Sequence, residues 1–188
     1  MVSYLFESNG FMKKTSLIKW TLVAAVVSAT ALAQPDPSIP DNAWKRKVKV
    51  AMMGDLLAID TPDGLAEVLL LCARAPKLKP DGAHEYMALQ ARHFTGEEVE
   101  GKDVWIVFDN PRNTPRRNNE GQFVAYVYYT KQETETSEGK TLLLNAEIIK
   151  KGLARVGTTY SCSKRSRMHE FQRQARRKRL GIWSVPPE

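Results

Sequence analysis

Two cationic side chains, Arg74 and Lys77, follow the most apolar stretch of this 188-residue chain. The stretch runs from Val68 to Ala73, which is the length of a strand and too short for an independent helix. A run without polar alternation is typical of a strand buried on both faces, and Pro76 ends it because proline cannot donate to a sheet. A buried strand that delivers charge to a turn often marks a functional site. The alternative is a core strand followed by a solvated turn.

Basic side chains also gather in two later segments. The loop 110–121 contains Arg112, Arg116 and Arg117, and the segment 163–180 carries eight Lys and Arg residues against one acid, Glu170. The formal net charge of +7 indicates an acidic partner or a negatively charged surface. Basic helices are more often simply solvated faces. The candidate phosphate-binding residues outside the turn are Arg116, Arg117, Tyr160, Arg173, Arg176, Arg177 and Arg179.

The cysteine and histidine content argues against a structural zinc site. The chain has 2 cysteines and 3 histidines, and their spacing does not match that of metal ligands. In an oxidising compartment two cysteines can instead form a disulfide.

The first 33 residues have the pattern of a secretory signal peptide. A basic segment begins at Met12, the apolar segment 20–29 is too short to cross a bilayer, and Ala31-Leu32-Ala33 is a cleavage pattern. We expect cleavage after Ala33, a secreted or periplasmic protein with no membrane span thereafter, and a true start at Met12. The alternative is an uncleaved membrane anchor.

The rest of the chain predicts a small domain, 45–184, after a proline-rich linker, 34–44. Alternation and β-branched content predict five strands, and apolar spacing predicts a helix around 86–94, started by Asp81 or Gly82, and two later helices. The segment 132–140 is expected to be an acidic turn. The strands are expected at 44–53, 56–60, 65–73, 104–108 and 122–130, and the later helices at 142–151 and 163–180. This order fits an α+β, mainly β fold, a five-stranded Greek-key barrel of the OB type with three helices.

Three strings resemble the thermonuclease, or staphylococcal-nuclease-like, family. They are 123–127, 144–156 and 175–184, and their most specific pieces are Gly-Leu-Ala-x-Val and Leu-x-Ile-Trp. The resemblance covers about 47–184. It implies a calcium-dependent phosphodiesterase with an aspartate in a Gly-Asp turn, an arginine in the third strand, an Asp-Thr-Pro-Glu turn and an arginine that opens the fifth strand. The metal and the guanidinium groups would neutralise charge on the phosphate, and the glutamate would act as a general base.

The sequence departs from this pattern at all of these positions except one. Asp55 is retained in Gly54-Asp55, and a turn former without a metal is the favoured interpretation because its usual partner is gone. The third-strand arginine is replaced by Leu69, the two carboxylates of the turn by Arg74 and Lys77, and the second arginine by Gln122. We therefore expect no cofactor, with calcium only if the family site is retained, and we expect the guanidinium group of Arg74 to take the place of the calcium charge.

The resemblance also bears on Tyr160 and on the cysteines. Tyr160 stands where the family often has a nucleotide-contacting tyrosine, and the alternative is boundary packing. In a barrel of this family Cys72 and Cys162 would both lie near the active-site side. We therefore predict a disulfide between them, the alternative being two buried free thiols.

Three functions remain open at this stage. The first is a monomeric, exported, catalytically degenerate thermonuclease-like module that binds nucleic acid or another polyanion. The second is an active nuclease with a displaced site that uses carboxylates near the hairpin and turn, namely Asp60, Asp63, Glu67 and Asp81. The third is a partner-binding module of the cell envelope that uses exposed Tyr and Phe side chains of the fifth strand.

Overall fold

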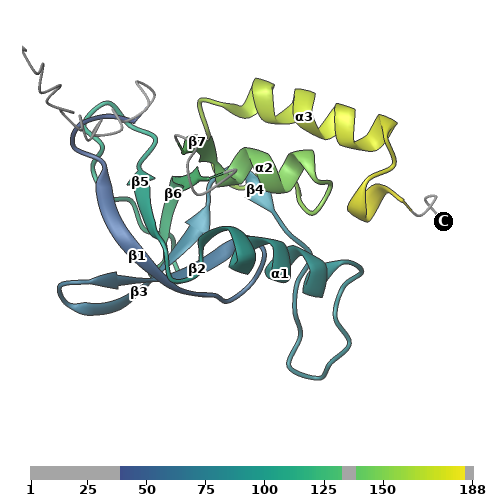
Figure 1. Ribbon diagram of the computed structural model, residues 1–188, viewed down its shortest axis with the longest axis horizontal. Helices are drawn as coiled ribbons and strands as arrows, with labels where there is room; N and C mark the ends of the chain where they lie inside the picture. The colour runs from purple at the N-terminus through teal and green to yellow at the C-terminus, as the bar shows by residue number, and fades with distance from the viewer. Residues whose placement is uncertain (1–38, 133–138, 185–188) are drawn as a thin grey trace, which may run out of the picture. The chain divides into compact units, whose positions relative to one another are not determined.

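The computed structural model describes residues 39–132 and 139–184 (Figure 1). The predicted signal peptide and most of the predicted acidic turn lie outside these ranges. In the described ranges, no helix has the length and apolar character needed to cross a membrane. The elements, in chain order, are β1 (Trp44–Ala51), β2 (Leu56–Thr61), β3 (Gly64–Leu70), β4 (Ala73–Arg74), α1 (Ala88–Val99), β5 (Asp103–Val107), β6 (Phe123–Lys131), β7 (Lys140–Leu143), α2 (Leu144–Lys150), β8 (Arg155–Val156), α3 (Arg165–Arg177) and the 3-10 turn η1 (Gly181–Trp183).

Five of these strands form a closed barrel. The sheet order is β3-β2-β1-β5-β6, and a parallel pairing of β3 with β6 closes it, with Val68 opposite Phe123 and Leu70 opposite Ala125. β7 adds to the free edge of β6, and sequence analysis did not predict it. The barrel with three helices confirms the predicted fold class.

The β6 strand is the most buried element of the barrel. It pairs with β5 and β3 and lies under α2, so every residue from Phe123 to Tyr129 is buried. Tyr126 and Tyr129 are each 1% exposed. The expectation that the Tyr and Phe side chains of this strand are exposed is therefore wrong, because this strand has sheet neighbours on both edges and a helix across it.

The apolar run that was predicted as one strand is divided between two. β3 ends at Leu70, and the chain turns through Cys72, which has a φ of 64°. β4 then pairs with β8 in a separate two-stranded ladder. The run is continuous in the sequence because both strands and the turn between them are buried, so hydrophobicity does not reveal the break. The N-terminal part of β3, which precedes the run, is not buried, since Leu65 is 69% exposed.

A buried asparagine holds this turn against the barrel. Asn145, in the first turn of α2, donates from Nδ2 to the carbonyl oxygens of Leu71 and Ala125 and accepts from Val127 N with Oδ1. Its three partners lie on the turn after β3 and on β6, so one side chain joins α2 to the strands that close the barrel.

Cys72 and Cys162 are joined by a disulfide, with 6.2 Å between their Cα atoms. The predicted bond is thereby confirmed, and the alternative of two free thiols is wrong. The bond ties the turn before β4 to the segment that precedes α3.

The helix predicted after Gly82 begins later than expected. α1 starts at Ala88, and Asp81 accepts a hydrogen bond from Ala83 N instead of capping the helix. The buried face consists of small side chains, Ala88, Ala91, Thr95 and Val99, whereas Leu89 is 55% exposed. Small residues are needed because the backbone of Gly54 packs directly on Ala91, where a Cβ on Gly54 would collide with it.

The two most specific strings of the sequence meet each other in the structure. Gly152 follows α2 and Gly181 follows α3, and each has a positive φ. Ile182 N donates to Gly152 O at 2.8 Å, and a Cβ on either glycine would collide with the backbone around the other. This close approach explains the glycine in both strings.

Residues at the end of the predicted linker contact the domain. Ile39 is 7% exposed and belongs to the core. Asn42 donates to Arg112 O, and its own carbonyl oxygen accepts from Asn113 Nδ2 at 2.7 Å. The ordered domain therefore includes these residues on the N-terminal side of β1.

Candidate functional site

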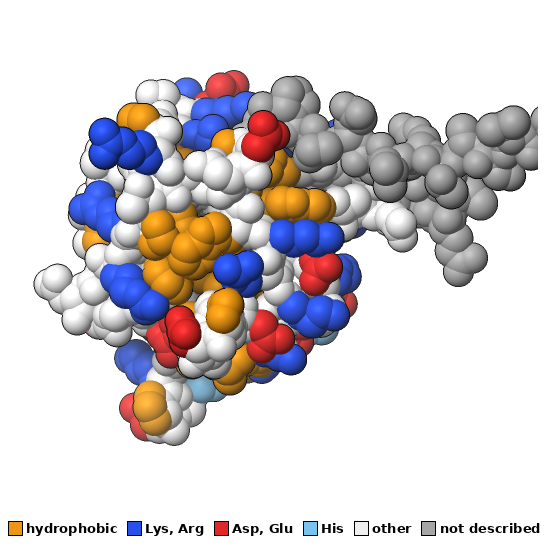
Figure 2. All heavy atoms as spheres, turned by 90° about the vertical axis from the view of Figure 1, so that its left-hand side faces the viewer, with side chains coloured by type: hydrophobic (Ala, Val, Ile, Leu, Met, Phe, Trp, Pro, Cys, Tyr) orange, Lys and Arg blue, Asp and Glu red, His pale blue; other side chains and the backbone are white. Residues whose placement is uncertain are grey.

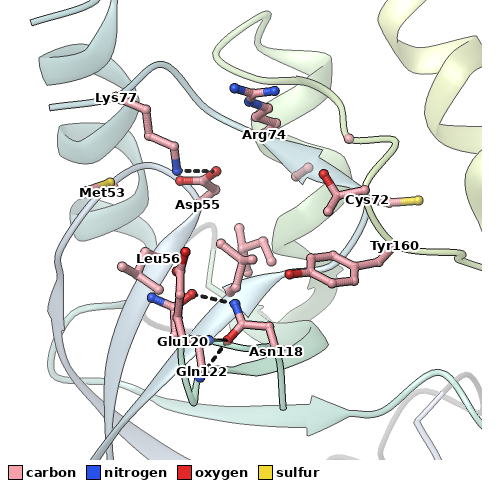
Figure 3. A pocket seen from close by; sticks show the side chains of 15 residues that line it. Met53, Asp55, Leu56, Cys72, Arg74, Lys77, Asn118, Glu120, Gln122 and Tyr160 are labelled. Atoms are coloured by element: carbon pink, nitrogen blue, oxygen red, sulfur yellow. Dashed lines mark hydrogen bonds and ion pairs between the residues drawn. The ribbon is translucent and has the colours of Figure 1, made fainter. Parts of the chain in front are cut away.

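The site positions that were identified from the sequence lie around one cleft of about 400 Å³ (Figure 3). Its walls come from the turn between β1 and β2, the end of β3, the β4 turn, the loop before β6 and the loop after β8. The chain segments that contribute are far apart in sequence, and the barrel closure brings them together. The site residues that line the cleft are Asp55, Leu69, Arg74, Lys77, Gln122 and Tyr160.

Asp55 is the most buried charged group of the cleft. It is 1% exposed, its Oδ2 accepts a hydrogen bond from Ala75 N at 3.1 Å, and Lys77 Nζ lies 3.5 Å from the same oxygen. The other carboxylate oxygen, Oδ1, is buried and has no hydrogen-bond partner. Burial raises the pKa of this carboxyl above 3.8, and the charge of Lys77 and the hydrogen bond from Ala75 oppose the rise only in part.

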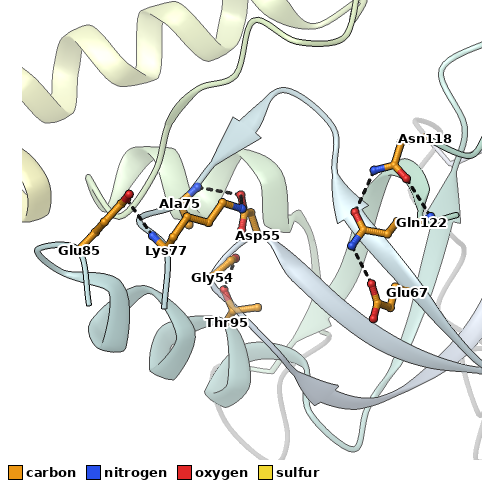
Figure 4. Close-up of polar contacts among 9 residues, drawn as sticks. All are labelled: Gly54, Asp55, Glu67, Ala75, Lys77, Glu85, Thr95, Asn118 and Gln122. Atoms are coloured by element: carbon orange, nitrogen blue, oxygen red, sulfur yellow. Dashed lines mark hydrogen bonds and ion pairs between the residues drawn. The ribbon is translucent and has the colours of Figure 1, made fainter. Parts of the chain in front are cut away.

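Lys77, rather than Arg74, supplies the positive charge next to Asp55. Its side chain reaches from the segment after β4 over the Gly54-Asp55 turn (Figure 4). The segment is held in place because Lys77 N donates to Glu85 Oε2 at 2.9 Å. On the other side of the turn, Thr95 Oγ1 donates to Gly54 O at 2.8 Å. The Asp55 carboxylate is thus fixed between α1 and the β4 segment.

Arg74 points into solvent at the rim of the cleft. It is exposed, and in the described residues no carboxylate lies within 4.0 Å of its guanidinium group. An exposed guanidinium without an internal partner is available to an external anion.

The two positions at which the family carries arginines contain no charge. Leu69 is half-buried on β3 and offers only methyl groups. Gln122 donates from Nε2 to Glu67 Oε2 at 2.7 Å, and its Oε1 accepts from Asn118 Nδ2 at 2.9 Å (Figure 4). The amide of Gln122 is therefore used within the protein.

The residues around Asp55 do not fit a calcium ion. Calcium takes six to eight oxygen ligands, usually from several carboxylates and carbonyls. In the described part of the chain no three His, Cys, Asp or Glu side chains are grouped as metal ligands. One oxygen of Asp55 already faces the ammonium group of Lys77, and like charges at Arg74 and Lys77 would repel a divalent cation.

The remaining basic candidates do not line the cleft. Arg117 stacks over the Phe123 ring at 3.8 Å and lines a separate hollow with Trp44 and Arg46, and Arg116 lines a small hollow behind Tyr160. Figure 2 views the molecule from the left-hand side of Figure 1, and hydrophobic side chains gather there with Lys and Arg side chains around them. On α3 and just after it, the exposed arginines are Arg167, Arg173, Arg176, Arg177 and Arg179, and the last four are the predicted candidates.

Two arginines of the cleft region were missed. Arg165 donates to the carbonyl oxygens of Gly157 and Tyr160, and so positions the loop that carries Tyr160. Arg155 lies directly opposite Arg74 in the β4–β8 ladder. Its place inside the Gly-Leu-Ala-x-Val string was visible, but no local signal indicated that β8 pairs with β4.

The carboxylates of the displaced-site alternative are not assembled into one site. Asp60 forms an ion pair with Lys49 at 2.9 Å, Glu67 accepts from Gln122, and Asp81 accepts from Ala83 N. Asp63 and Glu67 line the hollow that also contains Arg117, whereas Asp60 and Asp81 line neither this hollow nor the cleft.

The family model described as staphylococcal nuclease homologue matches residues 67–185 of this chain. The chain belongs to the staphylococcal nuclease family. An uncharacterized protein of Methanocaldococcus jannaschii is 25% identical over 155 residues, which is 73% of this chain and 70% of that protein. The matched range contains all of the altered positions of the family pattern and begins after Asp55.

Proposed function

We propose that this staphylococcal nuclease family member binds nucleic acid, or another polyanion, in the cleft and does not hydrolyse it. The observation that carries the proposal is the ion pair of Lys77 with Asp55 beside an unpaired Arg74. Lys77 balances the Asp55 carboxylate, so that the exposed guanidinium of Arg74 is left free to contact a phosphate, and Glu120 is the other charged residue that lines the cleft. Contacts from such groups to phosphate are insensitive to sequence and weaken with salt.

The proposal of lost hydrolysis is supported by the groups that are missing. A phosphodiester hydrolase of this type needs a metal, positive donors and a base held together around the phosphate. Asp55 is paired with an ammonium group, Leu69 has no donor and the amide of Gln122 is occupied by Glu67 and Asn118. We infer that the cleft holds a phosphate without activating water.

Tyr160 supports nucleic acid as the ligand among polyanions. Its half-buried ring lies on the wall of the cleft, across from Asp55 in Figure 3. Bases stack on aromatic side chains with little preference for sequence, and each stack contributes about 1–3 kcal/mol. An anion such as heparin has no aromatic base to stack.

We also propose that the protein is exported and acts as a monomer. The signal-peptide pattern of residues 1–33 supports export, and the Cys72–Cys162 disulfide fits an oxidising compartment. The natural start at Met12 and cleavage after Ala33 are part of this proposal, and N-terminal sequencing of the protein recovered from its source checks the cleavage position.

The experiment is a titration of the purified mature protein with a fluorescent ten-nucleotide single strand at several salt concentrations. Arg74→Ser is expected to weaken binding roughly tenfold and to reduce the slope of log affinity against log salt by roughly 0.7, the contribution of one phosphate contact on a single strand. A matched control is Lys47→Ser, which removes one charge from an exposed position of β1 outside the cleft. Equal effects of the two substitutions would contradict binding in the cleft.

The Tyr160→Leu variant separates nucleic acid from other polyanions. It is expected to weaken binding of the oligonucleotide severalfold and to leave binding of heparin unchanged, because only the bases stack. Equal losses for both ligands would assign the cleft to polyanions in general.

A further inference from the structure

Two like charges face each other directly in the β4–β8 ladder. Arg74 and Arg155 are Cα partners in this antiparallel pair, so their side chains leave the same face of the ladder. Like charges in directly opposed positions destabilise a sheet. Both side chains are exposed, and neither forms an ion pair in the described part of the chain.

The two arginines line a hollow that is distinct from the cleft. It measures about 360 Å³ and is lined by both guanidinium-bearing residues together with Pro76, Glu85 and Tyr86. Its one carboxylate, Glu85, already accepts the hydrogen bond from Lys77 N. Arg74 also lines the cleft, so the two hollows meet at this residue.

Positive charge continues from this hollow to α3. The guanidinium group of Arg155 lies 4.9 Å from the ring centroid of Trp183, and that of Arg176 lies 4.5 Å from the same ring. The tryptophan ring thus orients an arginine of β8 and an arginine of α3 and shields neither from solvent. The order of cationic groups from the cleft outward is Lys77, Arg74, Arg155 and Arg176.

We propose that Arg74 and Arg155 together bind a second phosphate group, and that a single strand of nucleic acid runs from the cleft across the β4–β8 ladder toward α3. The inference rests on the proposed function, because it extends the same ligand beyond the cleft. An anion between the two guanidinium groups removes their mutual repulsion, and arginine binds phosphate with paired, directional hydrogen bonds. Arg155 is the residue that distinguishes this path from binding in the cleft alone.

The test compares two ligands and three proteins. The ligands are deoxythymidine monophosphate, which can fill only the cleft, and a ten-nucleotide oligothymidine, which can reach both hollows. The proteins are wild type, Arg155→Ser and Arg112→Ser. Arg112 is an exposed arginine on the loop before β6, and it lines neither the cleft nor the second hollow. Affinities are measured at several salt concentrations, and folding of each variant is checked by thermal unfolding.

Arg155→Ser is expected to weaken binding of the oligonucleotide roughly tenfold and to lower the slope of log affinity against log salt by roughly 0.7. Binding of the mononucleotide is expected to stay unchanged. The oligonucleotide is expected to raise the Tm of wild type more than that of Arg155→Ser. If Arg155→Ser binds the oligonucleotide as Arg112→Ser does, the second phosphate site is overturned while the proposed function stands. If wild type binds neither ligand, both are overturned. Equal losses for both ligands would place Arg155 within the cleft site and overturn the path.

Discussion

The ammonium group of Lys77 lies 3.5 Å from the buried carboxylate of Asp55, in the position where the family pattern has a glutamate. The pair puts a cation beside the one acidic group that the pattern retains. A carboxylate pair that would attract a divalent metal is thereby replaced by an internal ion pair.

The pH dependence of folding should report the buried state of Asp55. Burial raises the pKa of Asp55 in the folded protein above its ordinary value of 3.8, which applies to the unfolded chain. Between the unfolded and the folded pKa, the folded protein therefore binds more protons than the unfolded chain. The contribution of protonated Asp55 to the free energy of unfolding is therefore complete below about pH 4 and is lost as pH rises through the folded pKa. Asn does not titrate, so we expect Asp55→Asn to lose no stability in this way. Its free energy of unfolding should increase relative to that of wild type as pH rises from about 4 to about 7.

Urea unfolding of both proteins across this pH range measures the difference between them. Other carboxyl groups titrate in both proteins and cancel. A difference that is constant with pH would mean that Asp55 titrates normally in the folded protein.

Calcium should have no effect on the wild-type protein. We expect no calcium-stimulated digestion of denatured DNA or RNA by the pure mature protein, since several groups are absent from one site and loss of a single stabilising donor typically costs about a hundredfold. The measurement is digestion with calcium or with chelator, with Asp55→Ala as the control for contaminating nuclease. Robust calcium-stimulated cleavage that disappears in Asp55→Ala would contradict the proposed function.

The complementary change should create a calcium site. Arg74→Asp combined with Lys77→Glu restores the two carboxylates beside Asp55 and removes the internal ion pair. We expect calcium to raise the Tm of this double variant and to leave the Tm of wild type unchanged, because a ligand stabilises the state that it binds. An unresponsive double variant would show that the surrounding backbone has also lost the calcium geometry.

The arginines at the end of α3 should contribute to polyanion binding through charge alone. Replacing Arg176, Arg177 and Arg179 together by Ser is expected to lower the salt slope for a single strand by roughly 2, the sum of three phosphate contacts. Each of the three is exposed. The comparison is with a triple Ser variant of Lys47, Lys140 and Arg112, which carries the same charge change elsewhere. Unchanged affinity in the α3 variant would confine the ligand to the cleft.

The disulfide should be a major part of the stability of the domain. It encloses a loop of 90 residues, and the chain-entropy model gives about 4 kcal/mol for a loop of this length. We expect the double substitution Cys72→Ser and Cys162→Ser to lower the free energy of unfolding by about this amount, measured by urea denaturation without reductant. Reductant should destabilise wild type and leave the double variant unchanged.

The barrel and the cleft were predictable to different degrees. Alternation at Trp44–Ala51 located β1, and the Pro-Asp-Gly turn at 62–64 located the hairpin of β2 and β3, because those signals are local. The division of the apolar run at Leu71 was not predictable, since it depends on Asn145, 74 residues later, for the hydrogen bond to the turn. The small apolar face of α1 was likewise hidden, because its packing depends on Gly54 from another part of the chain.

The cleft residues were predictable only through the family resemblance. Residue types at Asp55, Leu69, Arg74, Lys77 and Gln122 have no spacing that would join them without a known template. The guanidinium group of Arg74 was expected to take the place of the calcium charge, whereas the ammonium group of Lys77 is the one that lies beside Asp55, because β4 directs Arg74 outward to the ladder with β8. The direction of such a side chain depends on which strands pair with each other, and local sequence patterns do not predict that pairing.

The spacing of Cys72 and Cys162 also sets an order of events during biosynthesis. Cys72 leaves the ribosome 90 residues before its partner, after β3 and before α1, β5, β6 and α2 have been made. For most of translation it is a solitary thiol, and any earlier bond would have to be to another molecule. The native bond can form only when nearly the whole domain is present, so every strand of the barrel has been synthesised before oxidation becomes possible.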